Sequence, residues 1–215
     1  MKKKLRDQLC NKYPVLYQAI YYPYVIVNIV LPNEGFYCGD GWYTLLDTFS
    51  SLVFERDPAA VIHEINKDDG DALRVRMLTY NVDEDHDYIY GLESMMAKIS
   101  KISCEKCGKY VLPCTEYNPS GINKNKQYSN KIQLPLKLKN TGEMWYEMSR
   151  IFYETVSKCT EIYELPSVNF ERIENNNGKL EIEISGGTEP FEAQLYFLLT
   201  YANKVDPDTG ELVKL

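Results

Sequence analysis

The sequence predicts an α+β fold made of two tandem, duplicated α-β-β-α units, in which antiparallel hairpins are covered by helices. Both tryptophans, Trp42 and Trp145, open similar segments, each followed by Tyr and by apolar residues at helical spacing. Trp42 and Trp145 lie 103 residues apart, and the hairpin glycines Gly70 and Gly178 lie 108 apart, so the units differ by a short insertion. The alternative is a chance similarity between the halves. The two hairpins can join in one sheet or form two small sheets.

A helix and a strand precede the first unit. Apolar residues at three- and four-residue steps predict a helix over residues 5–19, which Pro14 ends or kinks. A continuous apolar run predicts a strand over residues 24–31. An apolar stripe then predicts a helix over residues 41–55, with Asp40 as its N-cap.

The first unit continues with a hairpin and a second helix. Residues 61–65 and 73–78 flank the polar, glycine-containing segment 66–71, which predicts two strands with one solvated face. Apolar spacing predicts the closing helix over residues 88–103. Turn-rich, aperiodic sequence then predicts a cysteine-containing linker or insert over residues 104–140.

The second unit repeats this order. Thr141 is the predicted cap of its first helix, and Asn177-Gly178 is a hairpin turn signal. The predicted helices and strands are 143–162, 168–173, 179–184 and 189–205. The chain therefore divides into an N-terminal strand with the first unit (1–103), the linker (104–140) and the second unit (141–215).

Composition limits the classes of partner. The chain has 24 Lys and Arg against 31 Asp and Glu, a formal net charge of -7, so nucleic acid is a less favoured partner than protein. Polar residues follow the basic N-terminus where a signal peptide would be apolar. The apolar run 24–31 is far shorter than a membrane span. We therefore expect a protein of the reducing cytoplasm of a host cell, with no membrane partner.

The first half resembles a known group of sequences. Cys38-Gly39-Asp40-Gly41-Trp42-Tyr43-x-Leu45-Leu46-Asp47, a hairpin around 61–75, and Cys104-Glu105-Lys106-Cys107-Gly108-Lys109 are similar to small phage and prophage proteins. Those proteins share a CGDGWxxLLD start and a CxxCGxxG segment, which is followed by a second Cys pair or Cys/His pair. The resemblance covers about residues 8–110 and implies no established activity. This chain lacks the second pair of metal ligands, since only Cys114 follows within reach.

Cys104-x-x-Cys107-Gly108 is the strongest chemical signal, because this spacing allows two thiolates to bind one tetrahedral zinc ion. Cys114 supplies a third predicted ligand. The fourth would have to come from elsewhere in the fold, and the candidates are Cys10, Cys38, Cys159, His63 and His86. The alternative is a set of reduced thiols without metal.

Catalysis has little support in the sequence, because the chain has two histidines and no Ser or Cys nucleophile motif. Tryptophans at helix starts are typical of the core, with exposed binding platforms as the alternative. Tyrosines gather near the N-terminus and favour a protein interface; they are Tyr17, Tyr21, Tyr22, Tyr24 and Tyr37.

The predicted function is that of a non-enzymatic, phage-type accessory protein. It would bind a host macromolecule, foremost a protein, and inhibit a defence or regulatory factor. The first alternative is a zinc-stabilised nucleic-acid-binding module that uses the cysteines and the linker lysines Lys124, Lys126, Lys131, Lys137 and Lys139. An enzyme of unknown class is the second alternative.

Overall fold

The computed structural model describes residues 1–18, 36–79, 85–110 and 141–213. It confirms a mixed α+β architecture, and the order helix, strand, strand, helix occurs twice in the described chain, in unit 1 (residues 36–110) and unit 2 (residues 141–213). The elements are α1 (Lys3–Lys12), the 3-10 turn η1 (Asp40–Trp42), α3 (Tyr43–Arg56), β1 (Val61–Lys67), β2 (Leu73–Leu78), α4 (His86–Ser100), α5 (Glu143–Tyr163), β3 (Asn169–Asn176), β4 (Lys179–Ser185) and α6 (Glu189–Ala202).

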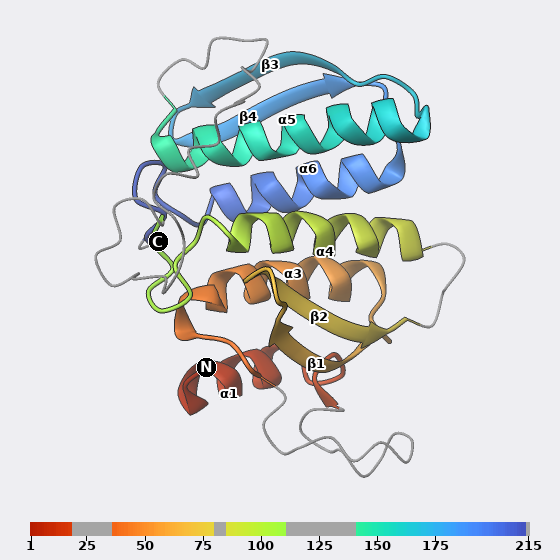
Figure 1. The fold of residues 1–215 in the computed structure, drawn as a ribbon. Coiled ribbons are helices and arrows are strands. Elements are labelled where there is room, and N and C mark those ends of the chain that lie inside the picture. The colour runs from red at the N-terminus through yellow and green to blue at the C-terminus, as the bar shows by residue number, and fades with distance from the viewer. Residues whose placement is uncertain (19–35, 80–84, 111–140, 214–215) are drawn as a thin grey trace.

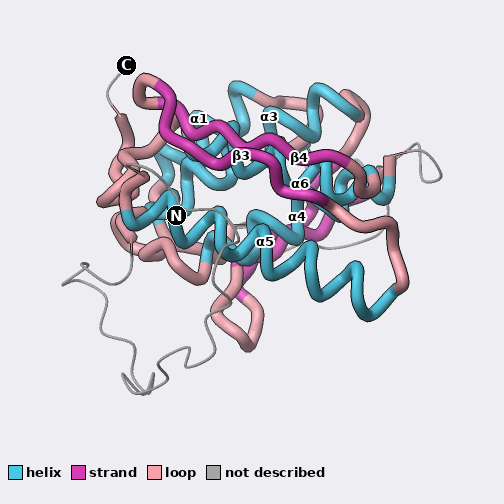
Figure 2. The backbone as a smooth tube through the Cα atoms, turned by 90° about the horizontal axis from the view of Figure 1, so that it is seen from above, coloured by secondary structure: helices cyan, strands magenta, loops and turns pink. Residues whose placement is uncertain are grey.

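The helices form the centre of the molecule and the hairpins lie outside them. Figure 1 shows the helices stacked in the order α5, α6, α4 and α3, with β1–β2 beside α3, and β4 contacts α6 next to α5. Figure 2 shows β3 and β4 lying across the helical layer. The described strands form two separate two-stranded antiparallel sheets, so the hairpins do not join.

Both tryptophans belong to the hydrophobic core that runs through the two units. Trp42 is 2% exposed and Trp145 is 1% exposed. The prediction that they are core residues is therefore confirmed, and the alternative of exposed binding platforms is wrong.

α4 and α6 are the central pair of helices and run side by side in the same direction. Arg56, at the end of α3, forms ion pairs with Asp85 and Glu189, which lie at the beginnings of the two helices. A Cβ atom on Gly91 would lie 2.4 Å from the carbonyl oxygen of Pro190. The missing side chain of Gly91 therefore allows α4 to approach α6 closely.

The two hairpins share one irregularity. The pairing of β1 with β2 shifts between Ile62 and Glu64, and that of β3 with β4 shifts between Phe170 and Arg172. In both hairpins the bulge therefore falls at the third residue of the first strand. Aligning the bulges makes each residue of β1 correspond to the residue 108 positions later in β3.

Two predicted helix caps are wrong. The N-cap of α3 is Trp42, and Asp40 lies inside the 3-10 turn, where its carboxylate accepts a hydrogen bond of 2.6 Å from the backbone nitrogen of Lys2. Asp40 therefore caps the beginning of α1, where a negative charge stabilises the helix dipole. The N-cap of α5 is Gly142, without a side-chain hydrogen bond, and the buried hydroxyl of Thr141 has no partner among the described residues.

Most other predicted boundaries are close to those observed, but the first helix, predicted over residues 5–19, is shorter. α1 ends at Lys12, shortly before Pro14, which cannot continue a helix. The strand predicted over 24–31 and most of the linker predicted over 104–140 lie outside the described residues. None of the helices in the described part of the chain is both long and apolar enough to cross a membrane.

The contact at Gly91 gives a test of how the two units pack. We expect Gly91→Ala to lower the free energy of unfolding by about 1–3 kcal/mol, because the added methyl group must push α4 and α6 apart. Gly70→Ala is the control, since its Cβ would lie 3.4 Å from the nearest atom, Asp68 Oδ1, in the hairpin loop. Urea unfolding of both variants measures the difference. A Gly91→Ala protein as stable as the wild type would contradict this packing.

Candidate functional site

The predicted metal ligands Cys104 and Cys107 lie in a tight turn directly after α4, which we call the cysteine turn (residues 103–110). The backbone nitrogen of Cys104 donates to the oxygen of Lys109 at 2.7 Å, and that of Gly108 donates to the oxygen of Cys104 at 2.7 Å. Gly108 has a φ of +80°, which favours glycine. Cys104 is fully buried and Cys107 is half-buried.

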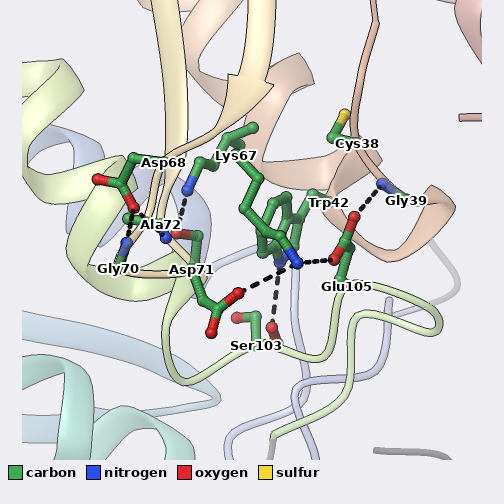
Figure 3. Close-up of polar contacts among 12 residues, drawn as sticks. Cys38, Gly39, Trp42, Lys67, Asp68, Gly70, Asp71, Ala72, Ser103 and Glu105 are labelled. Carbon is green, nitrogen blue, oxygen red and sulfur yellow. Dashed lines mark hydrogen bonds and ion pairs between the residues drawn. The ribbon is translucent and has the colours of Figure 1, made fainter. Parts of the chain in front are cut away.

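The cysteine turn holds the beginning of unit 1. Gly39 and Gly41 donate backbone hydrogen bonds to the side chain and the carbonyl oxygen of Glu105, at 2.9 and 2.8 Å. The indole nitrogen of Trp42 donates to the carbonyl oxygen of Ser103 at 3.0 Å (Figure 3). A Cβ atom on Gly39 would lie 2.2 Å from the oxygen of Glu105, and one on Gly41 only 2.3 Å from that of Cys104. The glycines of the Gly-Asp-Gly-Trp segment therefore have a structural role.

A second turn of the same form follows α6, and we call it the C-terminal turn (residues 205–212). Asp206 donates its backbone N–H to Glu211 at 2.7 Å, and Gly210 donates to the oxygen of Asp206 at 2.9 Å. The Asp206 carboxylate accepts hydrogen bonds from the backbone and hydroxyl of Thr209 and from the backbone of Asp208. The hydrogen bond from the Thr209 backbone is the main cause that lowers the pKa of Asp206.

The two turns correspond residue by residue, 102 positions apart, so Asp206 and Thr209 occupy the places of Cys104 and Cys107. In the C-terminal turn, the carboxylate oxygen of Asp206 accepts the hydrogen bonds that hold the backbone of the turn. A turn of this form therefore folds without thiols. The turns also contact each other, since Tyr110 donates its backbone N–H to the carbonyl oxygen of Thr209 at 2.7 Å.

Of the remaining predicted ligands, Cys38 lies beside the cysteine turn, because it precedes Gly39, which donates to Glu105 (Figure 3). Cys114 lies outside the described residues, and within the described ranges no group of three or more His, Cys, Asp and Glu side chains is arranged to hold a metal ion. Burial raises the pKa of Cys10 to about 11 and that of Cys38 to about 12, which opposes thiolate ligation. The other candidates belong to different elements; they are His63 in β1, His86 in α4 and Cys159 in α5.

Two half-buried charged groups on α4 had no signal in the sequence. Burial raises the pKa of Glu93, although Arg74 and a hydrogen bond from the backbone N–H of Val75 oppose this effect. Burial also lowers the pKa of Lys98, whose ammonium donates to Ser94 Oγ at 2.7 Å. Glu93 thus serves β2 as a hydrogen-bond acceptor.

A shallow groove lies between β4 and α6, and we call it the β4–α6 groove. Its walls are mostly apolar and consist of Ile184, Gly186, Glu192, Leu195, Tyr196 and Leu199. The four α6 residues are spaced three or four positions apart, so they share one face of the helix. Tyr196 is 46% exposed, and Glu192 forms no ion pair within the described ranges. This groove offers an apolar floor and a free carboxylate to a partner.

The comparisons with known proteins identify no relative. No protein-family model matches the sequence, and no curated protein or solved structure is significantly similar to it.

The zinc prediction is tested by the metal content of the purified protein. Zinc binding by the cysteine turn requires the thiolates of Cys104 and Cys107. If the zinc alternative holds, the protein carries about one zinc ion per chain, which is lost when both cysteines are changed to Ser. Cys159→Ser is the control and should keep the metal. Mass spectrometry of the native protein and elemental analysis measure the content, and a metal-free wild type would show that the thiols are simply reduced.

Proposed function

We propose that this is a non-enzymatic accessory protein of phage type that acts by binding another protein in the host cytoplasm. The β4–α6 groove is the observation that carries the proposal. It combines apolar side chains, a half-exposed tyrosine and a carboxylate that forms no ion pair among the described residues, and aromatic residues of this kind are enriched in protein interfaces. Inhibition of a host defence or regulatory factor is the specific role that we propose.

The surface beside the groove supports this function. Tyr88 packs on the guanidinium of Arg56, with 5.0 Å between the guanidinium carbon and the ring centre. Tyr196 is close enough to Tyr88 to contribute to its raised pKa, of which burial is the main cause. Two tyrosines and an arginine thus lie near the apolar groove, and such residues often dominate binding energy.

We also infer that units 1 and 2 descend from one duplicated α-β-β-α unit. The shared bulge position and the two turns with the same hydrogen bonds support this inference. Lys109 and Glu211 occupy corresponding positions in the two turns and pair with each other. In two identical copies these two positions would carry like charges, which repel each other. With Lys in one unit and Glu in the other, they form an ion pair instead. The Gly39-Asp40-Gly41-Trp42 segment supports the proposed relation to phage proteins.

The function is tested by quantitative capture from a bacterial host lysate on the immobilised full-length protein. We expect one host protein at near-stoichiometric level, and Tyr196→Ala should reduce its recovery about tenfold or more, as for an interface hot spot. Tyr90→Ala is the matched control. Tyr90 is 60% exposed on α4, two residues after Tyr88, so it faces away from Tyr196. Equal recovery by both variants would exclude this surface, and no partner at all would contradict the proposed function.

A further inference from the structure

The two hairpins differ in how their outer edges are covered. In unit 1, Leu73 of β2 donates its backbone N–H to Ser100 Oγ at 2.9 Å, and Val75 donates to the carboxylate of Glu93. Both acceptors belong to α4. On the other side of the hairpin, Tyr37 donates its backbone N–H to the oxygen of Ile65 at 2.7 Å. In unit 1, α4 therefore supplies acceptors to the outer edge of β2, and Tyr37 supplies a donor to the outer edge of β1.

The corresponding residues of β4 follow from the pairing register. Val75 pairs with Ile65 in unit 1, and Ile182 pairs with Ile173 at the same distance from the bulge in unit 2. By the same count, Leu180 corresponds to Leu73. The pair Asn176 and Lys179 closes a two-residue turn. Since outward and inward N–H groups alternate along a strand, those of Leu180, Ile182 and Ile184 point away from β3.

The helix that faces this edge cannot supply the same acceptors. α6 corresponds to α4 with a shift of 102 residues, the same shift as between the turns that follow the two helices. Leu195 therefore takes the place of Glu93, and Ala202 takes the place of Ser100. Neither side chain can accept a hydrogen bond. Within the described ranges, no backbone hydrogen bond from β4 other than those to β3 is found.

The free edge and the groove belong together. Leu195 lines the β4–α6 groove beside Ile184, which is half-buried at the open end of the strand. Ile182 is 6% exposed, so little of this residue is open to water. A ligand that fills the groove could at the same time place an acceptor on this edge.

We infer that the β4–α6 groove binds an extended segment of the partner protein, which adds to the edge of β4 and inserts an apolar side chain beside Leu195. This inference rests on the proposed protein-binding function and specifies its partner. Backbone carbonyl groups of the added strand accept from the outward N–H groups of β4, and the apolar side chain fills the groove. The net charge of -7 and the carboxylate of Glu192, which has no ion pair in the described part of the chain, favour a segment with Lys or Arg near that side chain.

The decisive variant restores the unit 1 arrangement in unit 2. Leu195→Glu places a carboxylate where Glu93 lies in the other unit, so it can accept from Ile182 and close the edge. Glu93→Leu is the reciprocal control and leaves the groove unchanged. Tyr196→Ala removes a wall of the groove at an exposed position, where folding is not at risk.

The probe is a set of synthetic peptides selected from a random 12-residue library on the immobilised full-length protein. We expect enriched peptides with an apolar residue next to Lys or Arg, bound at least tenfold more weakly by Leu195→Glu and by Tyr196→Ala. The affinity of Glu93→Leu should stay within twofold of the wild type. On binding, amide hydrogen exchange measured by NMR should slow at Ile182 and Ile184.

Several results would overturn the inference. Peptides that bind Leu195→Glu as tightly as the wild type, or leave the exchange of Ile182 and Ile184 unchanged, would show that the edge is not the site. A wild type that sediments as a dimer, and a Leu195→Glu variant that sediments as a monomer, would assign the edge to a second copy of the chain. A host protein captured equally by wild type and Leu195→Glu would leave the protein-binding function standing and reject only the strand addition.

Discussion

The structure depends on hydrogen bonds that join the first helix of each unit to the turn that ends the same unit. Gly41 donates its backbone N–H to the oxygen of Glu105, and Met144 donates to the oxygen of Pro207 at 2.9 Å. A helix start has free N–H groups that need acceptors, and here backbone carbonyl groups more than sixty residues later provide them. Because the two backbones meet directly, Gly39 and Gly142 have no room for a side chain. Each unit is closed on itself, and the contact between the two turns then joins the units.

This closure explains which features were predictable from sequence. The helices and hairpins follow from local periodicity, so their boundaries are close to those observed. The caps do not follow from local sequence: Asp40 and Thr141 are residue types that cap helices, but neither is the N-cap, and the acceptors for the helix starts come from turns that are distant in sequence. The CxxCG pattern coincides with a turn, and the C-terminal turn has the same backbone hydrogen bonds with Asp206 and Thr209 in the corresponding positions, while zinc binding stays a prediction.

The β4–α6 groove could not be predicted from the sequence, for another reason. Leu195 is an ordinary apolar residue in an amphipathic helix, and nothing in its own neighbourhood marks it. Leu195 becomes informative only by comparison with Glu93, the residue at the corresponding position of α4. That comparison requires the shift of 102 residues between α4 and α6, which the two turns establish. The similar segments at the two tryptophans led to the prediction of a repeat, but the informative positions are those where the two units differ.

The different hydrogen bonding of the two outer hairpin edges also affects stability. A buried backbone N–H without an acceptor costs about 1–3 kcal/mol, and Leu180 and Ile182, both buried residues of β4, have outward N–H groups without an acceptor among the described residues. Unit 2 can tolerate them because its helices share one hydrophobic core with unit 1, whose own hairpin has acceptors on its outer edge. A strand that binds to β4 supplies the missing acceptors and removes this cost, so part of the binding energy comes from hydrogen bonds that folding leaves unmade. One unit thus contributes stability that allows the other to keep an open edge.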